Sequence, residues 1–239
     1  MAALVETIGV SRRSLMTRMF AFGTGLAIGT PVLARTASES ALSWNFGAAA
    51  LDWEPVEIGT GDTLLVSAQV GGLPVRAVLD SGSGASIMST ALAAKLGLNN
   101  GERRMISGLS AKAPVQLVRD VDVLLARETR RLPFAVVGDL SAVSAAFGRP
   151  IDILLGADMF AGSSIALDFK SKRFAVAKSG AFLAGPGWRA IPLGRGAKQE
   201  LFIQASVAGL APAPLMIDLG SSAALMLSSS YARSQGLLT

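Results

Sequence analysis

The sequence contains no histidine and no cysteine among its 239 residues. Catalysis by a Ser-His-Asp or Cys-His arrangement is therefore excluded within one chain. Zinc sites built from thiolate or imidazole ligands are excluded as well, and no disulfide can form. Any hydrolytic chemistry has to come from carboxylates, lysine, serine, threonine or an oxygen-ligated metal. No EF-hand spacing of carboxylates is present, and we expect neither a metal nor an organic cofactor.

Aromatic residues are also scarce, at 6% of the chain, whereas 51% of the residues are hydrophobic. This composition is typical of a folded protein, and the length suits one domain or two small lobes. The formal net charge is +5. The nearest candidates for a basic patch are two isolated pairs, Arg103-Arg104 and Arg130-Arg131, without interleaved aromatics. We therefore predict no binding to nucleic acid.

Residues 1–34 have the pattern of an export signal. Arg12 and Arg13 resemble the twin-arginine motif, in which two arginines precede an apolar stretch. The stretch here, Met19–Leu33, is too short for a comfortable transmembrane helix, and small residues at its end favour cleavage after residue 34. We expect a periplasmic or otherwise exported protein that touches the membrane only transiently. The alternative is an uncleaved membrane anchor. Residues 35–57 form a leader without a recognisable motif.

Beyond residue 62 the pattern is that of short strands with few helices, which predicts an all-β architecture. A proline at position 133 predicts that its strand lies at a sheet edge. Ile165–Phe169 and Arg173–Ala177 are expected to form a hairpin. The other expected strands of this region are 64–70, 75–79, 114–125, 132–137 and 151–155, and the expected helices are 91–96 and 140–147.

An internal repeat organises the chain. An apolar strand leads into Asp80, and another leads into Asp218, with an offset of 138 residues and no gap in the flanking sequence. A short helix is expected after each aspartate. A glycine-proline-glycine linker at 185–187 separates the copies. We therefore predict a first lobe at 58–178 and a partial second lobe at 188–239.

The two aspartates suggest an acid–base pair. Two carboxyl groups held together cannot both ionise cheaply, because like charges repel at close range. One of them keeps a proton and acts as an acid, while the other takes a proton from water. The glycine two residues after each aspartate permits a close approach of the backbone. A hydroxyl between them can fix the orientation of a carboxylate.

These motifs resemble the pepsin and retropepsin clan of aspartic proteases. Val78–Ser83 is similar to the clan's apolar-apolar-Asp-Ser/Thr-Gly loop. Ile153–Phe160 is similar to the apolar strand ending in glycine that passes behind that loop. The resemblance implies an acid protease barrel, a flap over 105–118 and a peptide or protein substrate. It also implies catalytic roles for Asp80 and Asp218 and supporting roles for Ser81, Gly82, Ser83, Gly156 and Gly220.

The second loop departs from the clan pattern. Leu219 stands where the clan has serine or threonine, so one of the paired hydrogen bonds between the loops is expected to be missing. Only 21 residues follow Asp218, and we expect the second lobe to lack its flap and its glycine strand. The partner of Asp80 would be Asp218 in the same chain, or Asp80 of a second copy in a homodimer.

Simpler structural roles are also open for the acidic residues. Asp80 could cap a turn, and Asp218 could be structural. Asp152, Asp158 and Asp168 are expected to be solvated or turn-forming. The leading hypothesis is an aspartic endopeptidase. The alternatives are a non-catalytic peptide-binding protein and an inactive truncated homologue with the same fold.

Overall fold

The computed structural model describes residues 52–59, 62–98, 100–107, 112–179, 189–197 and 199–238. The predicted export signal, most of the leader, the glycine-proline-glycine linker and the tip of the predicted flap lie outside the described residues. Within the described ranges, no helix combines the length and the apolar character that crossing a membrane requires.

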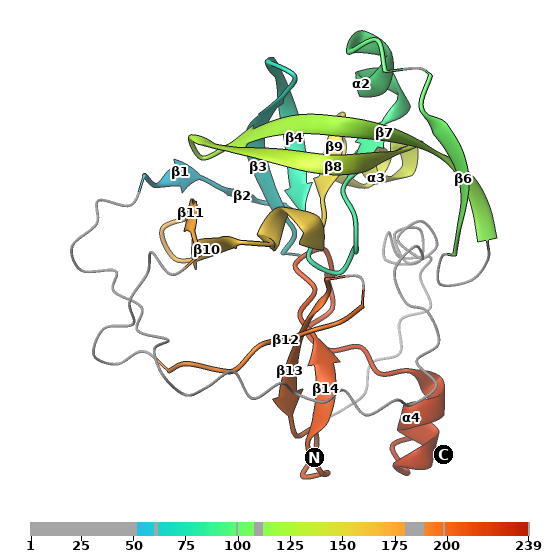
Figure 1. Cartoon of the computed structure of the whole chain (residues 1–239). Helices are drawn as coiled ribbons and strands as arrows, with labels where there is room; N and C mark the ends of the chain where they lie inside the picture. The colour runs from blue at the N-terminus through green and yellow to red at the C-terminus, as the bar shows by residue number, and fades with distance from the viewer. Residues whose placement is uncertain are drawn as a thin grey trace.

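The larger part of the described chain forms a closed β-barrel (Figure 1). Its sheet contains, in spatial order, β2 (Glu57–Ile58), β3 (Leu64–Val70), β4 (Leu73–Leu79), β9 (Ile153–Leu155), β5 (Ile87–Ser89), β8 (Glu128–Gly138), β7 (Lys112–Leu125) and β6 (Glu102–Ser107). Because β3 also pairs with β7, the sheet closes through β3, β4, β9, β5, β8 and β7. The predicted all-β barrel is thereby confirmed.

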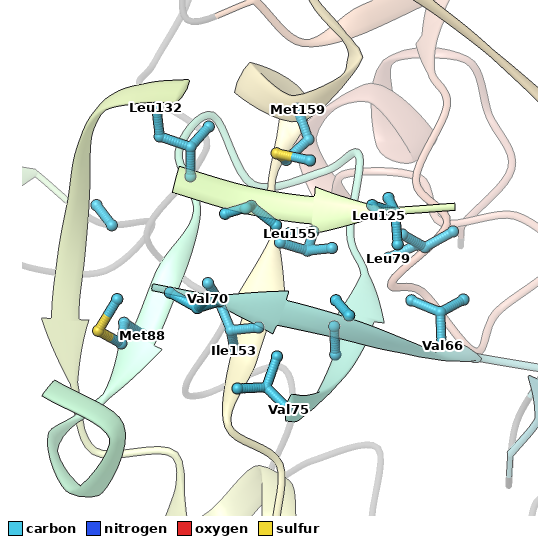
Figure 2. Close-up of a cluster of buried hydrophobic side chains, with 14 of the residues drawn as sticks. Val66, Val70, Val75, Leu79, Met88, Leu125, Leu132, Ile153, Leu155 and Met159 are labelled. Atoms are coloured by element: carbon cyan, nitrogen blue, oxygen red, sulfur yellow. The ribbon is translucent and has the colours of Figure 1, made fainter. Parts of the chain in front are cut away.

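The barrel is closed around an aliphatic core, as the apolar alternation of its strands predicted. Figure 2 shows Val70, Leu79, Ile153 and Leu155 pointing toward one another from β3, β4 and β9. All four side chains are fully buried. Burial of this kind of surface stabilises the fold by about 25 cal/mol per Å², so the strands around the Asp80 loop are its most firmly held part.

The prediction that Pro133 marks an edge strand is wrong, because β8 pairs with both β7 and β5. The register with β7 passes from Arg119↔Phe134 to Val121↔Leu132 and so skips Pro133 and the opposing Asp120. Asp120 has a φ of 55°, in the left-handed region, and the register is the same on both sides of it. The pairing with β5 begins only beyond this point. The missing N–H of the proline therefore costs no ladder hydrogen bond.

A second sheet lies beside the barrel and contains β1 (Glu54–Pro55), β11 (Arg173–Lys178) and β10 (Ser163–Asp168). The predicted hairpin is confirmed, because β10 and β11 are antiparallel. Asp168 holds its turn, accepting hydrogen bonds from Ser171 N at 2.9 Å and Arg173 Nε at 3.1 Å. Three short helices complete this part: α2 (Thr90–Lys95), α3 (Ser141–Phe147) and the 3₁₀ helix η1 (Ala157–Phe160).

The C-terminal segment forms a smaller unit that extends away from the barrel (Figure 1). It contains β12 (Gly194–Arg195), β13 (Leu201–Ala205), β14 (Ala213–Met216) and α4 (Ser229–Ser234). Its helix begins like α2 of the barrel. Ser228 Oγ accepts a hydrogen bond from Tyr231 N at 3.1 Å, as Ser89 Oγ does from Leu92 N. The order strand, aspartate loop, capped helix therefore occurs twice, as the sequence repeat predicted.

We expect the purified chain 35–239 to self-associate through the C-terminal unit. Large apolar side chains are exposed there, including Ile191, Leu193, Leu225 and Met226, which is 63% exposed. Exposed apolar patches and strand edges favour association. Light scattering coupled to size-exclusion chromatography should show species larger than a monomer at micromolar concentration, and Leu225→Ser with Met226→Ser should reduce them. A monomer at all concentrations would contradict this expectation.

Candidate active site

The Asp80 loop is held from behind by the strand that ends at Gly156. β4 and β9 run parallel, so the end of β4 lies beside the end of β9. Asp80 N donates to Leu155 O at 2.9 Å. A Cβ added at Gly156 would lie 2.5 Å from Ala85 C and 2.9 Å from Ser83 O. The predicted contact between this glycine and the loop is confirmed, and only glycine fits there.

The Asp218 loop docks face to face with the Asp80 loop. A Cβ added at Gly220 would lie 2.5 Å from Asp80 Oδ1, and one added at Gly82 would overlap the Asp218 carboxyl group. Each glycine thus lies against the carboxyl group of the other loop. The structure therefore brings the two predicted aspartates of one chain together.

Backbone amides orient both carboxyl groups in the same way. Asp80 Oδ1 accepts hydrogen bonds from Gly82 N at 3.1 Å and Ser83 N at 3.2 Å. Asp218 Oδ1 accepts one from Gly220 N at 2.9 Å. The equivalent contacts reflect the repeated sequence. The other oxygen of Asp80, Oδ2, is buried and accepts no hydrogen bond from a backbone amide of the described residues.

Ser81 ties the two loops together from one side. Its Oγ donates to Ile217 O at 2.7 Å and accepts from Leu219 N at 3.0 Å. Leu219 has no hydroxyl to return these contacts, as its identity predicted. Its side chain packs instead against the hydrophobic core of the barrel. An apolar contact of Leu219 thus replaces the second set of hydrogen bonds that a hydroxyl at this position would make between the loops.

The pair is arranged to hold one proton. Burial and the neighbouring charge of Asp218 raise the pKa of Asp80 to about 7. Burial also raises the pKa of Asp218, but the N–H of Gly220 and the hydrogen bond from Asp80 oppose that shift. Asp80 is 3% exposed whereas Asp218 is half-buried. When the pair holds a single proton, that proton therefore lies on Asp80 and the negative charge on Asp218.

Two further residues support the loop, and one of them was not expected. Ser83 Oγ donates to Ala85 O at 2.7 Å, in keeping with its predicted supporting role. Asp158, expected to be solvated or turn-forming, instead accepts hydrogen bonds from Ser86 N at 2.9 Å and Ser86 Oγ at 2.8 Å. Ser86 Oγ in turn accepts from Gly156 N at 3.0 Å. No local signal in the sequence indicated this contact, because Ser86 and Asp158 lie 72 positions apart.

The remaining acid of this region has a structural role. Asp152 Oδ2 accepts a hydrogen bond from Arg76 N at 2.9 Å, which joins the start of β9 to β4. In the part of the chain that the structure describes, no three acidic side chains gather into a group that could hold a metal ion. The chemistry available at the site is that of the carboxyl pair.

Comparison with known proteins agrees with this geometry. Residues 66–159 match the family model of aspartyl proteases. The matched segment contains Asp80 and Gly156 but ends before the second loop. Among solved structures, the chain is similar to a retropepsin-like aspartic protease from Rickettsia conorii, with 14% sequence identity and a TM-score of 0.39, and the match covers 52% of this chain and 93% of the other. No curated protein matches the chain.

Proposed function

We propose that the protein is an aspartic endopeptidase that hydrolyses peptide bonds with a water molecule activated by Asp80 and Asp218. The observation that carries this proposal is the mutual docking of the two loops, in which the glycine of each lies against the carboxyl group of the other. The raised pKa of Asp80, at about 7, gives the pair the single proton that such a mechanism requires. Perturbed carboxyl pairs of this kind are characteristic of functional sites.

The two carboxyl groups have different roles in this mechanism. Asp218 is the base, because it holds its proton less firmly and is more exposed. It removes a proton from water as the oxygen attacks the peptide carbonyl carbon. Asp80 transfers its proton to the carbonyl oxygen, on which negative charge develops. Asp218 then passes its proton to the leaving nitrogen, the C–N bond breaks, and Asp80 recovers its proton as the carboxylic acid forms.

We place the second carboxyl group in the same chain. Asp218 already lies against Gly82, so the pair does not need Asp80 of a second copy. A homodimer stays a prediction, and its role would lie outside the carboxyl pair. We also propose an exported location, on the support of the twin-arginine pattern in residues 1–34, which lie outside the described residues.

A non-catalytic peptide-binding protein is the second candidate function. The observation that favours it is the 3% exposure of Asp80, together with Leu219 in place of a hydroxyl residue. A buried carboxyl group, and hydrogen bonds between the loops from Ser81 alone, would suit a protein that binds peptides without hydrolysing them. Such a protein would bind peptides equally well before and after Asp80→Asn and would cleave none of them.

A peptide-library cleavage assay from pH 3 to 9 tests the proposed function. We expect cleavage to decline above pH 7, because Asp80 then loses the proton that its pKa of about 7 retains. We also expect decline at strongly acidic pH, where Asp218 becomes protonated and cannot act as a base. The apparent pKa values of the resulting bell-shaped profile would belong to the carboxyl pair and not to either aspartate alone. Undiminished cleavage at pH 9, or none at any pH by folded protein, would reject the proposal.

A further inference from the structure

A cavity of about 940 Å³ begins at the Asp80 loop. Ser83 and Gly84 bound it on one side, and β8 bounds it on the other. Its wall includes the aliphatic side chains of Ile87, Leu117 and Leu132. The volume lies within the range of pockets that bind small molecules or side chains. The cavity therefore lies beside the loop that carries Asp80.

Arg130 lines the cavity and is distinguished by the hydrogen bonding of its guanidinium group. Two of its guanidinium nitrogens, Nε and Nη2, are buried and have no hydrogen-bond partner among the residues that the structure describes. Buried charged groups in proteins are normally paired, and an unpaired one destabilises the fold. Nε and Nη2 also form one edge of the planar guanidinium group. That edge carries two parallel N–H donors, the geometry that binds both oxygens of a carboxylate.

The acidic side chains nearby are already engaged elsewhere. Asp158 lines the same cavity, but its oxygens accept hydrogen bonds from Ser86 and from Met159 N. Arg131 follows Arg130 in the strand, and it pairs with Asp120 at 3.3 Å and with Asp122 at 3.8 Å. Among the described residues, none of these carboxylates is therefore free to pair with Nε and Nη2 of Arg130.

We propose that Arg130 binds a carboxylate of the peptide substrate, so that the cavity selects peptides with an acidic group at one position. The inference rests on the proposed function, since it names a substrate class for the same site. The carboxylate would sit against the Nε–Nη2 edge, and the aliphatic wall would contact the methylene groups that carry it. The carboxylate belongs to an aspartate or glutamate side chain or to the C-terminus of the peptide.

Peptide binding to the Asp80→Asn variant tests this inference without requiring cleavage. The probes are fluorescent octapeptide libraries in which each position in turn is fixed as glutamate or glutamine, made with free or amidated C-termini. We expect glutamate to bind at least about 10-fold more tightly than glutamine at one position, because a charge-assisted bidentate pair contributes that much. Preference for free over amidated C-termini would instead assign the carboxylate to the chain end.

Substitution of the arginine provides the decisive comparison. Arg130→Met in the same background should abolish the preference, since the two donors that would hold the carboxylate are removed. Arg127→Met is the matched control, because Arg127 is 72% exposed and pairs with Asp52. It should leave the preference intact. No preference at any position or chain end, or one that survives Arg130→Met, overturns the inference. An intact preference without cleavage by the unsubstituted protein rejects only the proposed function.

Discussion

Asp80→Asn is expected to lower kcat/KM for peptide cleavage by about a thousandfold or more. The carboxamide keeps the shape of the protonated acid and can still accept hydrogen bonds from Gly82 N and Ser83 N. It cannot, however, donate a proton to the carbonyl oxygen and take it back. General acid–base groups contribute about 10²–10⁴-fold to catalysis. Steady-state kinetics on the best peptide of the library would measure the loss.

The same substitution has a second expected effect, on stability. A carboxyl group whose pKa is raised by folding, here from 3.8 to about 7, stabilises the folded state while it is protonated. That contribution is complete below pH 4 and is lost as the pH rises through 7. It amounts to at most about 4 kcal/mol for this shift. The variant should not show this decline, so it should be at least as stable as the unsubstituted protein at pH 8.

Asp122→Asn is the control for both measurements. Asp122 is an exposed carboxylate in β7 that pairs loosely with Arg131. Surface pairs of this kind contribute about 0–1 kcal/mol. Its substitution should change neither the cleavage rate nor the pH dependence of unfolding. If folded Asp80→Asn protein cleaved at the original rate, the chemistry would have to be assigned to another group.

Gly156→Ala is expected to destabilise the barrel by about 3 kcal/mol or more. The added methyl group would lie 2.5 Å from Ala85 C and 2.6 Å from Ala85 O. These are backbone atoms of the loop that carries Asp80, and they cannot rotate away as a side chain would. Overpacking of a rigid site costs about 1–3 kcal/mol, and more when backbone has to move. The melting temperature should fall by roughly 6–10 °C, and cleavage should fall with it.

Gly194→Ala is the matched control for the glycine. A Cβ at Gly194 would meet its nearest neighbour, Phe202 O, at 3.8 Å, which is an ordinary contact. Thermal unfolding followed by circular dichroism should therefore distinguish the two variants clearly. Equal melting temperatures for Gly156→Ala and the unsubstituted protein would show that the loop is less closely packed than the structure describes.

The strands and the two aspartates were predictable from the sequence because their signals are local. An apolar strand followed by Asp80 and two nearby glycines carries its own pattern, and the copy at Asp218 repeats it. The all-β class followed from many short alternating segments. Which carboxyl group would be the acid and which the base was not predictable, since the proposed assignment depends on how deeply each one is buried.

Features that depend on register could not be predicted from the sequence. Pro133 indicated an edge strand, but whether its missing N–H matters depends on which residue lies opposite, and that residue is Asp120, with which it forms no ladder pair. Asp158 lies 72 positions from Ser86, its main hydrogen-bond partner. Nothing local indicates that contact. The same holds for Arg130, whose unpaired nitrogens are defined by the absence of a neighbour among distant residues.

The contact of Leu219 with the barrel core makes docking of the second loop and proton uptake parts of one equilibrium. Docking brings Asp218 next to Asp80, and the proton affinity of Asp80 rises partly for that reason. By linkage, a proton bound there must favour the docked arrangement to the same extent. A hydroxyl at position 219 would add a polar lock that is insensitive to pH. With leucine in its place, the hydrogen bonds of Ser81 are joined by an apolar contact, and protonation of Asp80 is expected to add to the stability of the docked arrangement.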